Sequence, residues 1–294
     1  MTSLTKYVGQ YIRDTKALFT NKSPISRINL FLTYNRLVLK NILFTKLVKI
    51  NTKKEKIFGH VVYYENFNSF FAMFTEIFLH EVYAYKHPKL SLDDKINVVD
   101  CGSNIGLSLV YFKLIFPNAA IFCFEPDPIT FRILEKNVIT NKFKDVKLYQ
   151  MAVGDKKRKV TLYSFKEFGG GPGNSIMKKH IGFKNPSIIK VDMITLNDIG
   201  LEKIDLLKID VEGAEGKIIE GLSKTKLIRT IKIINLEYHY RNKDNSNRLG
   251  KILSFLEENK FSFVINPDTL VGETIDREGF LNKKGYLLII NAFR

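Results

Sequence analysis

The segment KINVVDCGSNIGLSLVYFKLIFPNAAIFCFE, residues 95–125, predicts one strand–helix–strand unit. Its first apolar run, residues 96–99, is short and β-branched, which is typical of a buried strand in a parallel sheet. Gly102 and Gly106 then allow a tight turn, and apolar residues at helical spacing predict a helix that opens near Asn104. A second apolar run ends in Glu125. We therefore expect a βαβ unit with a glycine-rich first turn and an acid at the tip of its second strand.

The glycine-rich turn indicates a ligand that carries a ribose and a charged group. Free N–H groups at the start of a helix bind anions, and an acid on the second strand can accept from both ribose hydroxyls. The spacing is D-x-G-x-x-x-G rather than the G-x-G-x-x-G of dinucleotide sites, and Asp100 before the turn suits an amino acid's ammonium group. We expect S-adenosylmethionine. A nucleotide-dependent oxidoreductase and a βαβ unit without a ligand are the alternatives.

Strands and helices alternate along the rest of the chain, which indicates an α/β fold with a parallel, doubly wound sheet. Asp127 before Pro128 predicts the start of a second helix. Residues 159–165 alternate like an exposed strand that pairs across a turn at 154–158, and residues 168–175 are expected to form a surface loop or a lid. Further strands are predicted at 146–149, 188–191, 204–210, 231–236, 261–265 and 286–291, and further helices at 195–200, 215–221 and 249–256.

The distribution of charge divides the chain. Residues 1–58 carry 12 Lys and Arg against 2 Asp and Glu, a net charge of +10, whereas residues 59–294 carry 34 against 28, a net charge of +6. We assign a basic helical extension to 1–58, a strand–helix lead-in to 59–94 and the main domain to 95–294. A strand is expected over 57–65, across the start of the lead-in, and a helix is expected over 71–85.

Apolar positions in the basic extension fall roughly on one helical face, with basic residues between and around them. Such a helix either lies on an anionic membrane surface or covers the domain with its charges in solvent. Nucleic acid is not the expected partner, because no aromatic-interleaved platform accompanies the charge. The apolar positions are Ile28, Phe31, Leu32, Leu39, Ile42 and Leu43, and the basic ones are Arg27, Arg36, Lys40, Lys46 and Lys49.

Cysteine usage and hydropathy indicate a reducing compartment. Cys101 and Cys123 both fall in the βαβ unit and are expected to be small buried thiols. Charged residues interrupt any apolar core near the start, so no signal peptide is predicted, and no window of about 18 uncharged apolar residues predicts a membrane-spanning helix. We expect a cytoplasmic protein, or a membrane-peripheral one if the extension binds lipid.

Six motifs together resemble the FkbM family of S-adenosylmethionine-dependent O-methyltransferases. The resemblance covers roughly Glu76 to Tyr240 and the closing strands. It implies a Rossmann-like class I methyltransferase fold, in which the doubly wound sheet is mostly parallel and the last strand antiparallel. It also implies an acceptor hydroxyl on a sugar, glycolipid or polyketide. The motifs are VVDCGSNIG (98–106), FEPDP (124–128), MAVGD (151–155), Asn174-Ser175, VDMITLND (191–198) and LLKIDVEGAE (206–215).

The same resemblance implies which residues bind the cofactor. Glu125 would hold the ribose, and Ala152 and Val153 would border the adenine. The methionine part would be held by Asp100, Gly102, Asn104 and Gly106.

Methyl transfer to an alcohol needs a base or a metal, because an alcohol is a weak nucleophile at neutral pH. In a parallel sheet the reacting groups gather at the carboxyl ends of the strands. Asp210 and Glu212 follow one predicted strand, and Glu237 and His239 follow another. His239 is the first candidate for the base, with a structural imidazole as the alternative.

Two charged residues near these strand ends have simpler structural interpretations as well. Lys208 lies inside a predicted strand, where a charge needs a partner, and we expect Asp210 or Glu237; a direct action on the acceptor is the alternative. Glu215 is expected to stabilise the start of the following helix.

A divalent cation held by Asp210, Glu212 and Glu237 is left open, and no metal ligand is assigned. The favoured function is an O-methyltransferase that acts on a hydroxyl of a sugar, glycolipid or other small-molecule or glycan acceptor. The alternatives are an RNA methyltransferase that uses the basic extension and a non-catalytic nucleoside-binding module held at a membrane.

Overall fold

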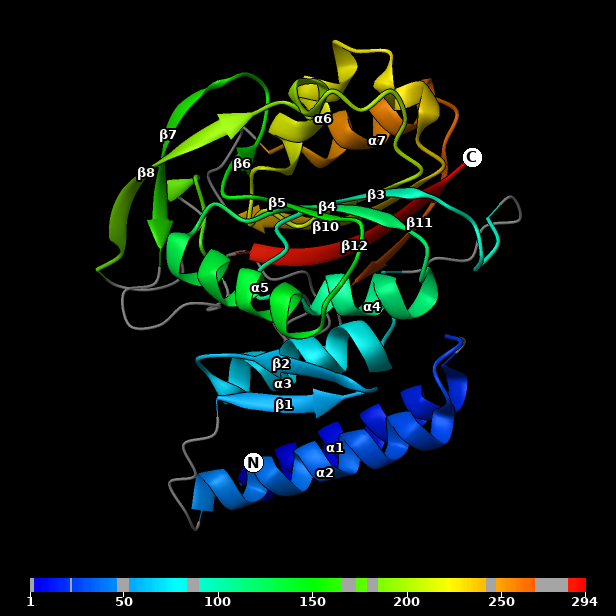
Figure 1. The fold of residues 1–294 in the computed structure, drawn as a ribbon, viewed down its shortest axis with the longest axis vertical. Helices are drawn as coiled ribbons and strands as arrows, with labels where there is room; N and C mark the ends of the chain where they lie inside the picture. Colours follow the sequence, from blue (N-terminus) through cyan, green and yellow to red (C-terminus); the bar gives the residue numbers. More distant parts are fainter. Residues whose placement is uncertain are drawn as a thin grey trace.

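The computed structural model describes residues 3–21, 23–46, 53–83, 90–164, 173–178, 185–241, 247–267 and 285–294. Its central sheet contains β3 (Asn97–Cys101), β4 (Ala120–Phe124), β5 (Val146–Tyr149), β9 (Leu206–Ile209), β10 (Ile233–Arg241), β11 (Ser262–Pro267) and β12 (Gly285–Phe293). Their spatial order is β11–β12–β10–β9–β3–β4–β5 (Figure 1). The strands from β10 to β5 are parallel, and β12 is antiparallel to both of its neighbours. This order confirms the predicted Rossmann-like α/β fold with an antiparallel last strand.

Helices cover both faces of the sheet. α4 (Leu107–Ile115) and α5 (Pro128–Thr140) lie on the face turned toward the N-terminal segment, and α6 (Glu215–Ser223) and α7 (Leu249–Glu258) lie on the other (Figure 1). Asp127 caps α5 as predicted, because its side chain accepts from the N–H groups of Ile129 and Thr130. α6 runs past its predicted end at Gly221. A Cβ there would lie 2.6 Å from the carbonyl oxygen of Gly154, so this glycine allows close packing and does not end the helix.

A separate three-stranded sheet contains β6 (Ala152–Val153), β7 (Arg158–Ser164) and β8 (Ser187–Ile194) in the order β6–β8–β7. The predicted pairing across the turn at 154–158 is wrong. β8 lies between the two segments, parallel to β6 and antiparallel to β7. The helical turn η3 (Leu196–Ile199) follows β8, within the helix predicted over 195–200, and begins with a capping box of Thr195 and Asp198.

The N-terminal segment contains a β-hairpin as well as helices. α1 (Ser3–Thr20) and α2 (Arg27–Lys46) are followed by β1 (Lys54–Ile57) and β2 (His60–Tyr63), which pair antiparallel. Strand β1 therefore lies where the predicted helical extension ends. The strand expected over 57–65 corresponds to β2, the second strand of the hairpin. Phe58 and Gly59 form the turn with φ values of 47° and 88°.

The aromatic helix begins and ends earlier than the predicted 71–85. α3 (Phe67–Phe74) starts after Asn66, whose side chain accepts from the Ser69 N–H, and it continues as a π-helical turn, η1 (Thr75–Leu79). Directly after η1, His80 Nε2 lies 2.9 Å from the Asp14 carboxylate of α1, which links the end of this helix to α1.

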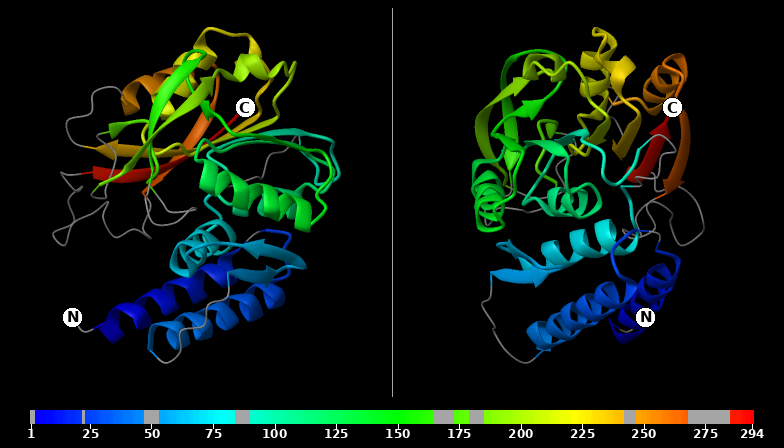
Figure 2. Two further views of the ribbon diagram at one scale, coloured as in Figure 1. Left: turned by 60° about the vertical axis from the view of Figure 1, so that its left-hand side comes forward. Right: turned by 45° about the vertical axis from the view of Figure 1, so that its right-hand side comes forward.

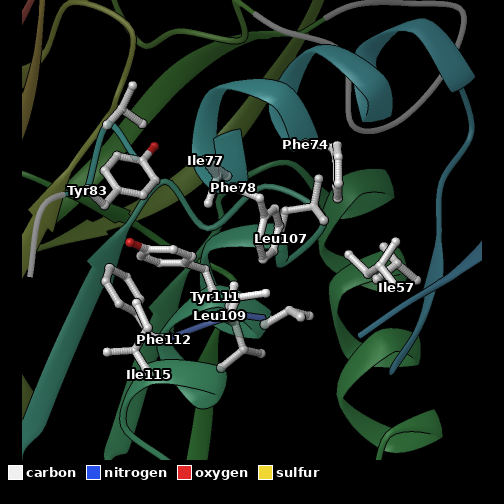
Figure 3. Close-up of a cluster of buried hydrophobic side chains, with 14 of the residues drawn as sticks. Ile57, Phe74, Ile77, Phe78, Tyr83, Leu107, Leu109, Tyr111, Phe112 and Ile115 are labelled. Carbon is white, nitrogen blue, oxygen red and sulfur yellow. The ribbon is translucent and has the colours of Figure 1, made fainter. Parts of the chain in front are cut away.

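One apolar cluster joins the N-terminal segment to the sheet. Figure 3 shows Phe74 and Phe78 packed near Leu107 and Tyr111 of α4. The Phe78 and Tyr111 rings meet edge to face with centroids 5.6 Å apart, and such pairs add about 0.5–1.5 kcal/mol beyond the area they bury. The extension and the α/β part therefore share a core. From α1 and α2 the cluster includes Leu18, Leu30, Tyr34 and Leu37.

The face of α2 that the sequence pattern selects lies on the outside of the protein. Ile28, Leu32 and Leu39 are 72%, 59% and 58% exposed, and Phe31 and Ile42 are exposed as well. α2 packs on α1, α3 and η1, and its side chains Leu30, Tyr34 and Leu37 are buried. The side chains of Leu43 and Lys46, and Lys49 altogether, lie outside the described residues.

Two expectations about compartment have structural counterparts. Cys101 and Cys123 are buried and unpaired, and burial raises the pKa of both thiols. Of the helices in the described ranges, none is long and apolar enough to cross a bilayer.

Candidate active site

The glycine-rich turn between β3 and α4 has an unusual backbone that its sequence explains. Gly102, Asn104 and Gly106 have φ values of 85°, 47° and 92°. A Cβ on Gly102 would lie 1.7 Å from the Asp210 carbonyl oxygen, so only glycine fits where the turn crosses the end of β9. The N–H groups of Gly102 and Ser103 both donate to the Phe124 carbonyl, at 3.0 and 2.9 Å. These bonds fix the turn against the end of β4.

Glu125 lies directly after β4 and is 6% exposed. One carboxylate oxygen accepts from the Asn104 N–H at 3.0 Å, and the other accepts from the Asp127 N–H at 2.9 Å. Burial raises the pKa of Glu125 to about 8 despite these two bonds. The carboxyl group is thus held at the junction of the turn and the second strand, where the sequence placed it.

A cavity of about 650 Å³, measured with its open mouth, lies between this turn and the three-stranded sheet. Gly102, Asn104 and Glu125 line one side, and Asp210 and Glu212 line another. Apolar residues make up much of the remaining lining, among them Phe124, Met151, Ala152, Val153, Leu162 and Ile176. Five of the seven predicted cofactor-binding residues therefore reach this cavity: Gly102, Asn104, Glu125, Ala152 and Val153.

Asp100 and Lys208 lie beneath the turn, on paired residues of the neighbouring strands β3 and β9. Lys208 Nζ lies 3.2 Å from Asp100 and 3.3 Å from Asp210, and it donates to the Gly102 carbonyl at 2.6 Å. Burial opposes the charge on Lys208, but the surrounding carboxylates raise its pKa. The expected partner Asp210 is confirmed. Glu237 forms no ion pair with Lys208 in the structure as described, and Asp100 takes that place.

This arrangement gives Asp100 and Lys208 supporting positions. Asp100 is fully buried and also accepts from the Ser108 hydroxyl at 2.6 Å. Neither residue lines the cavity, and Gly106 lies behind it at the start of α4. Lys208 joins the turn to the end of β9 and so helps to set the shape of the cavity.

His239, on β10, is surrounded by carboxylates. Its Nδ1 lies 3.0 Å from Glu215, and its Nε2 lies 3.3 Å from Glu212 and 3.5 Å from Glu237. Burial lowers the pKa of His239, but the three carboxylates outweigh burial and raise it well above 6.5.

Glu215 fixes the orientation of His239. The Glu215 side chain is fully buried, accepts from the Gly213 N–H at 2.9 Å and binds the Asn247 amide at 2.5 Å. The sequence assigned Glu215 only to the start of α6. Its link to His239 was missed, because it depends on β10 lying beside the β9–α6 turn.

Glu212 connects the histidine to the cavity. Its carboxylate accepts from the Gly173 N–H at 2.8 Å, and its carbonyl accepts from the Ser175 hydroxyl at 2.5 Å. Burial raises the pKa of Glu212, and the nearby His239 partly offsets this rise. Burial also raises the pKa of Glu237, and the nearby carboxylates of Asp210 and Glu76 raise it more. Of the predicted loop or lid, residues 168–172 lie outside the described part of the chain, whereas Gly173 and Asn174 line the cavity.

Asp210, Glu212 and His239 could together hold a cation. Each offers one ligand atom, and these atoms lie within 4.8 Å of one another. Carboxylate oxygens suit Mg²⁺, and an imidazole whose second nitrogen binds a buried carboxylate is a usual ligand of transition metals. The set differs from the one considered from sequence, because His239 replaces Glu237.

Comparison with known proteins identifies a family. The model described as "Methyltransferase FkbM domain" matches residues 100–263. A protein from Beauveria bassiana, "Methyltransferase 1", is 30% identical over 42% of this chain and 57% of its own length. The chain therefore matches less than two thirds of that relative.

Two further relatives have names that state a position of methylation. "31-O-demethyl-FK506 methyltransferase FkbM" from Streptomyces tacrolimicus is 25% identical over 69% of this chain and 85% of its own length. "2-O-methyltransferase NoeI" from Sinorhizobium fredii is 29% identical over 45% of this chain and 61% of its own length.

Proposed function

The chain belongs to the FkbM methyltransferase family, and from this premise we propose that it transfers a methyl group from S-adenosylmethionine to a hydroxyl of a sugar, glycolipid or other small-molecule or glycan acceptor. The observation that carries the proposal is the position of His239. It lies at the carboxyl ends of the parallel strands, held by a buried glutamate, with its second nitrogen beside a carboxylate that lines the cavity. That is where a base must lie in a fold of this class.

The lining of the cavity suits the chemistry of S-adenosylmethionine. Glu125 would accept from the ribose hydroxyls, and Ala152 and Val153 would border the adenine on the apolar wall. Gly102 and Asn104 would contact the methionine part, with Asp100 and Gly106 supporting their turn. When bound, the cofactor supplies an electrophilic methyl carbon on a cationic sulfonium.

The acceptor hydroxyl must lose a proton as its oxygen attacks. Glu212 reaches the cavity and touches His239, so we place the proton acceptor in the pair Glu212–His239. A carboxylate whose pKa is raised is a stronger base than an exposed one, which favours proton transfer near neutral pH. Glu237 and Asp210 complete the charged surroundings, and Lys208 acts through the turn that it holds.

The carboxyl groups of the site favour a neutral acceptor. Asp210 and Glu212 line the cavity, whereas the nearby cation Lys208 lies beneath it and is paired with Asp210. Phosphates of an RNA would be repelled at close range. A sugar or polyol hydroxyl carries no such charge, and the printed names of the two O-methyltransferase relatives agree with an oxygen acceptor.

The test separates chemistry from binding. Since the proton acceptor acts in the transition state, His239→Ala should lower turnover by about 10²–10⁴-fold while the affinity for S-adenosylmethionine stays within a few-fold. Turnover on a panel of glycan and small-molecule alcohols is followed by the release of S-adenosylhomocysteine, and binding by isothermal titration.

His80→Ala serves as the matched control, because His80 is also paired with a carboxylate but lies on the N-terminal side of the protein. If a cation held by Asp210, Glu212 and His239 activates the acceptor instead, a chelator should abolish turnover and Mg²⁺ should restore it. Wild-type turnover by His239→Ala, without any effect of chelator, would contradict both versions of the mechanism.

A further inference from the structure

The helix pair α1 and α2 presents a mostly apolar surface that no described segment covers. Figures 1 and 2 show the pair at the end of the molecule farthest from the central sheet. We define the outer face as the exposed side chains of Ile12 and Phe19 on α1 and of Ile28, Phe31, Leu32 and Leu39 on α2. The α2 members recur at intervals of three, four and seven residues, so they form one stripe along the helix. The opposite stripe of α2 is already used to pack on the domain.

Exposed apolar side chains scattered singly are ordinary, but this group is different. Phe19 and Ile28 are each 72% exposed, and Tyr11 and Asn35, which join the two helices by a hydrogen bond of 2.9 Å, lie between the helices. The apolar positions of α1 and α2 therefore lie on adjoining helices that are fixed to each other. Contiguous apolar surface of this kind marks an interaction site.

The charge around the outer face is of one sign. Arg13, Lys16 and Arg27 are exposed. The segment's two acids are buried: Asp14 pairs with Tyr34 and His80, and Glu55 pairs with Arg36 and Lys40. Across the described part of residues 3–57, no carboxylate is therefore exposed to solvent. A partner for this face has to be anionic or neutral.

We propose that the outer face of α1 and α2 docks on the surface of an anionic lipid bilayer. The aliphatic and phenylalanine side chains would enter the boundary between headgroups and acyl chains, with Arg13, Lys16 and Arg27 at the level of the headgroups. A second copy of the chain fits less well, because a symmetric contact would bring two cationic faces together without a carboxylate to pair them. A nucleic acid also fits less well, because its bases stack on aromatic side chains and its phosphates need cations, and the stripe of Ile28, Leu32 and Leu39 is aliphatic. The proposal does not depend on methyl transfer.

The test uses the full-length protein and co-sedimentation with vesicles of two compositions, phosphatidylcholine alone and phosphatidylcholine with about one third phosphatidylserine. We expect binding to the anionic vesicles that weakens at high salt, and little binding to the neutral ones. The double substitution Leu32→Asn/Leu39→Asn should weaken binding by about tenfold or more, since it removes apolar area from the stripe. Arg13→Gln/Lys16→Gln should weaken it roughly fivefold per charge removed.

Matched controls use equally exposed residues elsewhere on the surface. Ile129→Asn/Ile188→Asn removes two exposed apolar side chains from α5 and β8, and Lys226→Gln/Lys251→Gln removes two exposed charges. Neither control should change vesicle binding. Circular dichroism and thermal melting establish that every variant is folded, which is expected because the substituted side chains are exposed.

Three results would overturn the proposal. Absence of binding to anionic vesicles is one, and equal binding to neutral vesicles is another. The third is a self-association, seen by analytical ultracentrifugation, that Leu32→Asn/Leu39→Asn abolishes while vesicle binding remains; the outer face would then be an interface between copies.

Discussion

The affinity for the cofactor should depend on pH through Glu125. Its carboxyl group is 6% exposed and accepts from two backbone N–H groups, and burial raises its pKa to about 8. The carboxylate form accepts hydrogen bonds from the two ribose hydroxyls better than the neutral acid does. The neutral acid predominates below the pKa. The carboxylate, which is the form that binds the ribose, is therefore scarce at low pH and becomes dominant as the pH rises through 8.

The size of the effect follows from that pKa. The carboxylate accounts for about one molecule in a hundred at pH 6 and about one in ten at pH 7. Because an apparent Kd is the intrinsic Kd divided by the fraction that is competent, it should fall roughly ninetyfold between pH 6 and pH 9. Glu125→Gln keeps the shape of the side chain and removes the titration. At pH 9 this variant should bind about 5- to 150-fold more weakly than the wild type, the equivalent of about 1–3 kcal/mol for a charged hydrogen bond.

Isothermal titration with two ligands isolates the ribose contact. S-adenosylmethionine has an amino group that titrates in the same range, whereas 5′-methylthioadenosine has the same nucleoside without the amino acid. Both should bind more tightly to the wild type as the pH rises, and the Glu125→Gln variant should lose that dependence for 5′-methylthioadenosine. A wild-type affinity that is flat from pH 6 to pH 9, or an equal slope in Glu125→Gln, would refute the assignment of the ribose to Glu125.

Two other predictions concern the parts that hold the site. Glu215→Gln removes a buried negative partner of His239, so the pKa of His239 should fall and the pH at which turnover is half-maximal should move down by roughly one unit or more; an unmoved pH–rate profile would place the titrating group elsewhere. Gly102→Ala would bring a Cβ within 1.7 Å of the Asp210 carbonyl and should abolish cofactor binding and lower the melting temperature, whereas Gly250→Ala, which meets nothing within 4 Å, should do neither.

Local patterns predicted the parts of the fold that depend on neighbouring residues. The βαβ unit, the Asp127 cap and the Thr195 capping box were all accessible from sequence, because each is set by residues within one turn or one strand. The order of β6, β8 and β7 was not. Strand β7 alternates clearly, but its partner comes from beyond a long intervening segment, and alternation does not identify a partner.

The site divides in the same way. The strand-end residues Asp210, Glu212, Glu237 and His239 could be placed at one edge of the sheet, because strand ends follow from the fold class. The Glu215–His239 and Asp100–Lys208 pairs could not, since each needs the register of two strands. For α2, the pattern identified an apolar stripe correctly but not which way it faces, because Leu30, Tyr34 and Leu37 form a second stripe that the domain buries.

The core that α2 shares with α3 and η1 has a consequence for biosynthesis. Leu30, Tyr34 and Leu37 leave the ribosome before α3 and η1, which end at Leu79 and pack on α2. At about 5–20 residues per second, this delay is roughly 2–8 s. During that interval α2 is apolar on both sides, and of the elements that pack on it in the described structure only α1 has been made. A nascent-chain chaperone or a nearby bilayer would meet this helix before the central sheet exists.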